Sequence, residues 1–450
     1  MAEALGARLA DWVSALRFED LPTPVVAGAK RLLLDTLSVG WAGSACPGID
    51  DLHAHAKAKA GVAEAGVWAF GGRLPAGEAA LVNGAMAAAL DFDTVHDLAG
   101  SHSDIVVLPA VLALAERERL TGREFLAAYA AGSEALVRLS LALTARPGWF
   151  YSSVLGVFGA AAASARALRL DATRTRHALG IALSRAAGTQ LTLVERSLTK
   201  RLQSAFAARD GVEAAQLAAI GVTAPARMFE GAGGFSALYG EVDAAKALEG
   251  LGRHWSFTAL TFKKHASCYC NHAAIEAALA LVSRHGVRAG DLAEVTVRLT
   301  PFMARLVGAD YAPGDNPQVA AQFSARYSVA SVLARGRFAV EDILPAAATD
   351  AAVLALAGAV RIEVDESQSG KFLPATVRVR TRDGHSHAAT VTELAGTPRL
   401  PFSDGELRAK ALACFAGGVQ PLDCDAAGRF AARIAAVDEI TDMREWLASA

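Results

Sequence analysis

The chain has 450 residues, of which 53% are hydrophobic and 20% are charged, and its formal net charge at pH 7 is −2. This length predicts two domains, because a single hydrophobic core rarely grows so large. The near-neutral charge and the lack of a basic stripe argue against a nucleic-acid-binding protein. Much of the apolar composition is alanine and no uncharged apolar run reaches 18 residues, so we expect no membrane span.

Cysteine usage and the first residues bear on the compartment. The five Cys residues, an odd number in so long a chain, argue against a disulfide scaffold. The sequence opens without a basic segment followed by an apolar one, so we expect no secretory signal. We therefore predict a reducing, cytoplasmic location. The alanine-rich helices are typical of a large buried bundle, often in an oligomer.

The first elements in chain order are helical. Thr23 and Pro24 supply an N-cap and a first helical position for a helix that ends near a break at residues 43–48. Residues 67–70 predict a short strand. Alanine-rich helical patterning then extends from about residue 77 to residue 250.

One polar segment interrupts this helical region at residues 91–104. It carries four Asp and two His residues between apolar stretches that we expect to form buried helices. Such a cluster requires partners or a ligand, because desolvating charged groups costs free energy. We predict that it forms the floor of an active site, with His102 at the mouth of a cavity. A structural histidine, and helix caps at Asp91 and Asp93, are the alternatives.

Three later segments place ionisable groups in apolar surroundings. Lys200 and Arg201 precede an apolar helix and would hold a carboxylate well. Lys263 follows a Phe, and desolvation beside other cations would lower its pKa and make it a base. A hydroxyl at Tyr327 would donate to a substrate. For Lys200 and Arg201 the alternative is an exposed cation pair. For Tyr327 the alternative is ordinary core packing.

A fourth segment contains soft potential metal ligands. It carries His265, Cys268, Cys270 and His272. Their spacing does not close one tetrahedron easily, and no second Cys pair lies nearby. Only two Cys residues are close in sequence, which also argues against an iron–sulfur cluster. We therefore predict no metal at this segment.

The sequence period changes near residue 290. Four stretches alternate as half-buried strands do, at residues 294–300, 360–364, 376–381 and 386–393. Asp383-Gly384 predicts a hairpin between the last two, and a helix is expected at 327–335. We therefore predict a smaller α+β domain over residues 255–395.

The chain ends in helical patterning. Ser403 and Glu406 form a capping box that opens a helix, and the residues from 426 onward are helical again.

Several of these segments, in this order, resemble the MmgE/PrpD family, which includes 2-methylcitrate dehydratase, cis-aconitate decarboxylase and iminodisuccinate epimerase. The resemblance runs from about residue 5 to residue 445. The matching positions are residues 83–84, 90–93, 107–110, 158–162, 199–202, 262–263, 267–268 and 323–324, with His96, His102, His272, Tyr327, Leu407 and Lys410.

The resemblance implies a mainly α fold. Residues 1–254 and 396–450 would form a large all-helical domain, and residues 255–395 would form the α+β lid domain. It also implies a homodimer and a site between the domains that needs no metal or organic cofactor. The expected catalytic residues are Asp91, His102, Lys200, Lys263 and Tyr327. The expected substrate-binding residues are His96, Arg201, Lys264 and His272.

The departures from the family bear on the reaction. Many relatives have an Asp and a hydroxyl residue where this chain has Thr94 and Val95, and Phe150 stands in the place of a histidine. These losses remove candidate acids for hydroxyl departure, which would harm a dehydratase more than an epimerase.

We therefore predict proton transfer on a small dicarboxylate, with iminodisuccinate epimerisation as the favoured reaction. His102 and Lys263 would move the proton, while Lys200 and Arg201 would bind carboxylates. Three alternatives remain open: a 2-methylcitrate dehydratase-like enzyme, a cis-aconitate decarboxylase-like enzyme acting on a tricarboxylate, and a non-catalytic ligand-binding relative.

Overall fold

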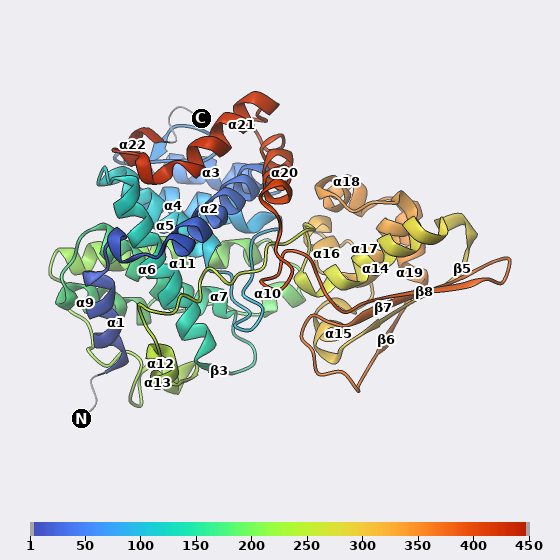
Figure 1. The fold of residues 1–450 in the computed structure, drawn as a ribbon, viewed down its shortest axis with the longest axis horizontal. Coiled ribbons are helices and arrows are strands. Elements are labelled where there is room, and N and C mark those ends of the chain that lie inside the picture. The colour runs from blue at the N-terminus through green and yellow to red at the C-terminus, as the bar shows by residue number, and fades with distance from the viewer. Residues whose placement is uncertain (1–3, 447–450) are drawn as a thin grey trace.

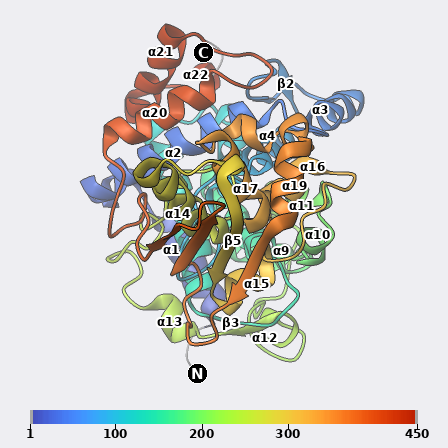
Figure 2. The same ribbon diagram turned by 90° about the vertical axis from the view of Figure 1, so that its right-hand side faces the viewer.

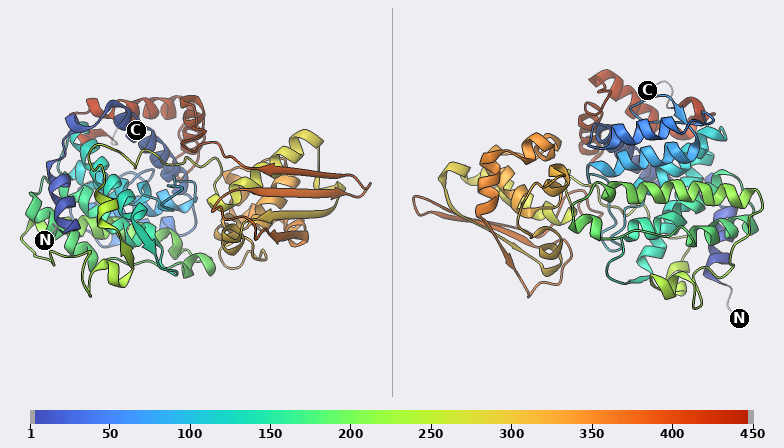
Figure 3. Two further views of the ribbon diagram at one scale, coloured as in Figure 1. Left: turned by 60° about the horizontal axis from the view of Figure 1, so that its bottom comes forward. Right: turned by 180° about the vertical axis from the view of Figure 1, so that it is seen from behind.

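The computed structural model describes residues 4–446 and consists of a large helical domain and a smaller domain built on a β-sheet (Figure 1). The mainly α architecture predicted from the sequence is confirmed. The smaller domain projects from one side of the helical domain, as the views from below and behind show (Figure 3). The exact limits at residues 254/255 and 395/396 stay a prediction.

The helical domain contains the elements from the N-terminal part of the chain and the last three helices. Its longer helices are α1 (Leu5–Ala15), α2 (Thr23–Gly43), α3 (Ile49–Ala58), α4 (Ala76–Ala89), α5 (Asp104–Arg117), α6 (Gly122–Leu141), α8 (Gly156–Ala167), α9 (Ala172–Leu183), α11 (Thr199–Ala219), α20 (Asp404–Phe415) and α21 (Cys424–Ala435). Its short helices are α7 (Tyr151–Val154), α10 (Leu191–Val194), α12 (Phe235–Leu238), α13 (Ala244–Leu248) and α22 (Met443–Trp446). Two small antiparallel pairs join β1 (Ala65–Gly66) to β2 (Arg73–Leu74) and β3 (Leu143–Ala145) to β4 (Gly240–Val242).

Both ends of the chain build this domain. Helices α20 and α21, red in Figure 1, lie against the blue helix α2. Among the ion pairs that link these segments, Lys30 Nζ lies 2.5 Å from Asp438 Oδ1, and Lys410 Nζ lies 2.7 Å from Asp35 Oδ1. The second pair is buried, so it joins the ends inside the core rather than at the surface.

The smaller domain is a four-stranded sheet with helices packed on it. The strand order is β6 (Val360–Val364), β5 (Leu292–Leu299), β7 (Ala375–Thr381) and β8 (Ser386–Val391), with only the β5–β6 pair parallel. In β7 the buried residues alternate strictly, as in a sheet with one covered face. The domain's helices are α14 (Tyr269–His285), α15 (Pro301–Val307), α16 (Pro317–Gln322), α17 (Ala325–Arg335), α18 (Pro345–Ala348) and α19 (Ala351–Ala359).

The sheet stands in front of the helical domain when the molecule is viewed from the side of the smaller domain (Figure 2). Helix α14 covers β7 and β8, and α17 packs against α14 and β6. All four strands expected from alternation are present, and so is the capping box in which Ser403 accepts from the Glu406 backbone N–H.

Two local predictions were wrong. Residues 67–70 are a turn between β1 and β2 rather than a strand, and Phe70 N–H donates to Trp68 O within it. Helix α2 begins at Thr23 with Pro22 in the cap position, so the Thr23 side chain does not cap it. The second error moves the start of the helix by one residue, where single residues decide the outcome.

The buried Lys410–Asp35 pair predicts an unequal cost for two similar substitutions. Lys410→Met leaves the Asp35 carboxylate buried without its cation and is expected to lower the free energy of unfolding by about 3 kcal/mol. The matched change Lys30→Met removes a partly exposed ion pair between the same segments and is expected to cost about 1 kcal/mol or less. Urea unfolding followed by circular dichroism measures both, and equal losses would contradict the prediction.

Candidate functional site

A cavity of about 400 Å³ lies between the two domains. The helical domain contributes the segment between α4 and α5, the end of α6, residues 149–152 and the start of α11. The smaller domain contributes the start of α14, helix α15 and the loop before β7. The polar segment predicted to floor an active site therefore does line a cavity.

Asp91 lies at the centre of the cavity floor, between two lysines. Lys200 Nζ donates to Asp91 Oδ1, and Lys263 Nζ lies 2.8 Å from the Asp91 backbone O and 3.2 Å from Oδ2. All three side chains are buried, and that of Lys263 is 0% exposed. Asp91 follows the end of α4 with a φ of 50°, a left-handed conformation that aspartate tolerates better than most residues.

His102 lies beside this group and is oriented by Asp93. Its Nδ1 is 2.7 Å from Asp93 Oδ2 and 2.9 Å from Thr94 O. Because both of these partners are acceptors, Nδ1 carries a proton and Nε2 is the nitrogen that can exchange one with a substrate. The ring is 18% exposed and lines the cavity. Lys263 Nζ is also 3.9 Å from Asp93 Oδ1, so His102 and Lys263 share one carboxylate.

Two contacts bring these distant segments together. Val95 and Thr261 form an antiparallel bridge, with N···O distances of 3.1 and 2.8 Å, and so fix Lys263 next to the polar segment. From the C-terminal helix α20, Lys410 Nζ donates to Phe92 O at 2.9 Å and lies 4.0 Å from the Phe92 ring centroid. A backbone bridge to Thr261 and helix α20 thus hold the segment that bears the catalytic candidates.

The electrostatics of the floor correct one prediction. Burial lowers the pKa of Lys263, but the carboxylates of Asp91 and Asp93 raise it more, so the net pKa lies above its ordinary value. Conversely, burial raises the pKa of Asp91, while Lys200 and Lys263 lower it more, so the net pKa lies below its ordinary value. The expected lowering of the Lys263 pKa by neighbouring cations is wrong, because its neighbours are carboxylates. Lys263 is an ammonium at neutral pH and not a base.

The structure brings four of the predicted site residues together and places five elsewhere. Asp91, His102, Lys200 and Lys263 line the cavity. The others do not, and their polar groups have protein partners. Arg201 donates to Pro47 O and Gln318, Lys264 pairs with Glu276, the His96 Nδ1 accepts from Ala99 N–H, His272 Nε2 is 3.3 Å from Ser267 O, and Tyr327 OH donates to Asp342 O.

The placement of these five speaks against the contacts with substrate predicted for them. The prediction for Arg201 did not take helix geometry into account. Successive residues on a helix point about 100° apart, so Lys200 and Arg201 face different surroundings. The predicted Tyr327 hydroxyl is buried within the smaller domain, where it packs against Tyr311.

The four soft ligands considered for zinc fall into two pairs, with the His265 and His272 ring centroids 5.3 Å apart and Cys268 hydrogen-bonded to Cys270. His265 Nε2 lies 2.5 Å from Glu276 Oε1, while Cys268 and Cys270 line the cavity. Across residues 4–446, no group of three or more His, Cys, Asp or Glu side chains is arranged to hold a metal ion.

Three further cations line the cavity and were not singled out from the sequence. Lys371 Nζ donates to Leu98 O at 3.1 Å, and Arg196 donates to Ala312 O at 2.8 Å, so each bridges the two domains. The Arg305 guanidinium lies 5.3 Å from the Phe302 ring centroid. No sequence pattern marks them, because each becomes significant only through the packing of one domain on the other.

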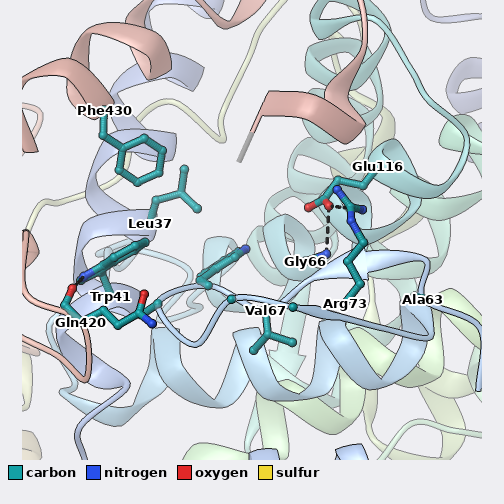
Figure 4. A pocket seen from close by; sticks show the side chains of 13 residues that line it. Leu37, Trp41, Ala63, Gly66, Val67, Arg73, Glu116, Gln420 and Phe430 are labelled. Atoms are coloured by element: carbon teal, nitrogen blue, oxygen red, sulfur yellow. Dashed lines mark hydrogen bonds and ion pairs between the residues drawn. The ribbon is translucent and has the colours of Figure 1, made fainter. Parts of the chain in front are cut away.

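A second and larger cavity, of about 520 Å³, lies in the helical domain away from these residues (Figure 4). Trp41 and Phe430 form part of its apolar wall. Among the lining residues that the structure describes, Arg73 and Glu116 alone are charged, and they bind each other at 3.0 Å. Glu116 also accepts from Gly66 N–H. Because one cation pairs with one carboxylate here, this cavity lacks the excess of cations found around Asp91.

An oriented imidazole beside two buried ammonium groups defines an acid–base enzyme site. Comparison with known families then places the chain: it matches the MmgE/PrpD N-terminal domain over residues 7–247 and the MmgE/PrpD C-terminal domain over residues 265–431. The chain belongs to the MmgE/PrpD family, and it is an enzyme of the isomerase or lyase kind that the family resemblance predicted.

Similar curated proteins agree with this placement. The cis-aconitate decarboxylase-like protein oryM of Aspergillus oryzae is 30% identical over 440 residues, covering 90% of this chain and 89% of the relative. The human cis-aconitate decarboxylase is 27% identical over 430 residues, covering 91% and 87%. The Aspergillus terreus cis-aconitate decarboxylase is 29% identical over 296 residues, covering 62% and 60%. These names describe lyases and do not favour the epimerase.

None of the helices within residues 4–446 combines the length and the apolar character that crossing a membrane requires.

Cys268 allows the charge of the cavity to be measured without a substrate. Its thiol lines the cavity, and a hydrogen bond from Cys270 lowers its pKa against the opposing effect of burial. We compare the alkylation rate with anionic iodoacetate to the rate with neutral iodoacetamide at each thiol. This ratio is expected to be about ten-fold higher at Cys268 than at the exposed Cys424, because cations concentrate anions locally. Peptide mass spectrometry of the alkylation rates checks this, and equal ratios at both thiols would contradict it.

Proposed function

We propose that the protein is a lyase that decarboxylates a small unsaturated di- or tricarboxylate. The observation that carries the proposal is the charge around the cavity. Among its lining residues in the described chain, Asp91 is the only carboxylate, whereas five side chains are cationic: Arg196, Lys200, Lys263, Arg305 and Lys371. Such a surface binds polyanions and stabilises negative charge that develops during a reaction.

The step follows from the groups on the floor. The bond from a carbon to one carboxylate breaks and carbon dioxide leaves, while the electron pair remains as an enolate-like anion next to another carboxylate. Lys200 and Lys263 supply fixed positive charge for that anion. His102 Nε2 then donates a proton to carbon, and Asp93 stabilises and orients the imidazolium that donates it.

This proposal takes one of the alternatives left open by the sequence in place of the epimerase. An epimerase needs one base and one acid on opposite faces. Lys263, the group expected beside His102 in that pair, gives up its proton poorly, because Asp91 and Asp93 raise its pKa against the effect of burial. A dehydratase needs an acid for a leaving hydroxyl, and Phe150 and Val95 line the cavity where the family pattern has polar side chains. The names of the relatives favour the decarboxylase further.

The proposal is tested by incubating the protein with unsaturated tricarboxylates in deuterated buffer. One carbon-bound deuterium is expected for each carbon dioxide released, measured by NMR and by gas analysis. His102→Asn is expected to lower the rate by about a hundredfold or more, because it removes the proton donor. His55→Asn, on an exposed helical face away from the cavity, is the matched histidine control.

Other outcomes would replace the proposal. Deuterium uptake without carbon dioxide would indicate the epimerase, and loss of water from a hydroxy-tricarboxylate would indicate the dehydratase. Binding without turnover of any of these acids would favour a non-catalytic relative. The homodimer and the cytoplasmic location stay predictions that light scattering and cell fractionation can check.

A further inference from the structure

Both domains contribute apolar side chains to the lining of the cavity. Leu98, Leu193 and Val194 line it from the helical domain, while Phe302, Leu306 and Phe372 line it from the smaller domain. We propose that the substrate carries an alkyl chain of several carbons in addition to its carboxylates. This inference rests on the proposed decarboxylation and names the class of acid that would undergo it.

Exposure is the first argument. The side chains of Leu98 and Val194 are 78% and 73% exposed, although most large apolar residues of this protein are buried. Covering such side chains with an apolar ligand is favourable by about 25 cal/mol for each Å² removed from water. A purely polar polycarboxylate would leave this surface wet, and an alkyl chain would cover it.

The arrangement of charge is the second argument. The buried ammonium groups of Lys200 and Lys263 lie at the floor, whereas Arg305 and Lys371 are exposed beside the apolar side chains. We call the exposed residues Leu98, Val194, Arg305 and Lys371 the rim. Lys371 donates to Leu98 O across the domain boundary, so residues of both domains meet at the rim. A ligand whose carboxylates meet the floor lysines and the rim cations, and whose aliphatic chain lies along the apolar side chains, matches this arrangement.

The interior side chains give the third argument. Val95 is buried and Phe150 is half-buried, and both line the cavity together with His102. Ligand cavities commonly combine apolar walls with a few placed polar groups that orient the ligand. The cavity volume of about 400 Å³ lies in the range typical of such sites and leaves space for a chain beyond the carboxylates.

The experiment compares unsaturated tricarboxylates that bear hydrogen, methyl, propyl or hexyl at the same carbon. We expect kcat/KM for carbon dioxide release to rise by about four-fold for each methylene until the cavity is filled, which corresponds to about 0.8 kcal/mol per buried methylene. Val194→Asn is expected to flatten this dependence. Leu191→Asn, at a 53% exposed position on the same short helix but outside the cavity lining, is expected to leave it unchanged.

Two results separate this inference from the proposed function. If the unsubstituted acid releases carbon dioxide as fast as the alkylated acids, or faster, the inference of an alkyl chain is wrong. The proposed decarboxylase function is then still supported. If no acid in the series is decarboxylated, the proposed function fails. Calorimetric titration with alkylsuccinates then tests whether the cavity binds an alkyl chain. Tighter binding with chain length, lost in Val194→Asn, would support the alkyl site. Binding independent of chain length would overturn it.

Discussion

The site depends on one buried carboxylate shared by two ammonium groups. Asp91 ends the α4 segment, Lys200 opens α11, and Lys263 lies in the segment that leads to the smaller domain. An isolated charge in such a place would be neutralised or would unfold its surroundings, because desolvation costs several kcal/mol for each ion. Each of the three groups is therefore stable only while the others are in place. The same interaction fixes where the smaller domain meets the helical one.

This interaction also divides the chemical roles. A lysine acts as a base only when its pKa is lowered, and a carboxylate neighbour has the opposite effect. Lys263 is thus suited to hold negative charge and not to carry a proton. Lys200, which pairs with the same Asp91 carboxylate, places a second cation beside it. His102 is left as the group with an available nitrogen, and Asp93 fixes which nitrogen that is. A single proton carrier beside fixed cations suits a reaction in which carbon receives one proton.

The sequence predicted the strands and the polar segment better than it predicted which side chains contact one another. Alternation gave the strands of the smaller domain, and charge density in an apolar region marked residues 91–104, because both are properties of neighbouring residues. The sign of the Lys263 pKa shift was missed because the Asp91 carboxylate is 172 residues away in the chain. Arg201 was assigned by its adjacency to Lys200, and adjacency on a helix separates side chains. Lys410 was noted in the family pattern, but nothing local shows that it supports Phe92.

The strength of the contacts between the domains differs between the floor and the rim. At the floor, Lys263 is fully buried and bound to Asp91, so separation there would expose or unpair charges. At the rim, Lys371 reaches across to a backbone oxygen from an exposed position, where water can replace it at little cost. The half-buried Arg196 also reaches across the boundary, to Ala312 O. Opening of the cavity is therefore easiest at the rim. A substrate that enters there meets apolar side chains and cations before its carboxylates reach the lysines. The cations would attract an acid with an aliphatic chain, and the apolar side chains would orient it.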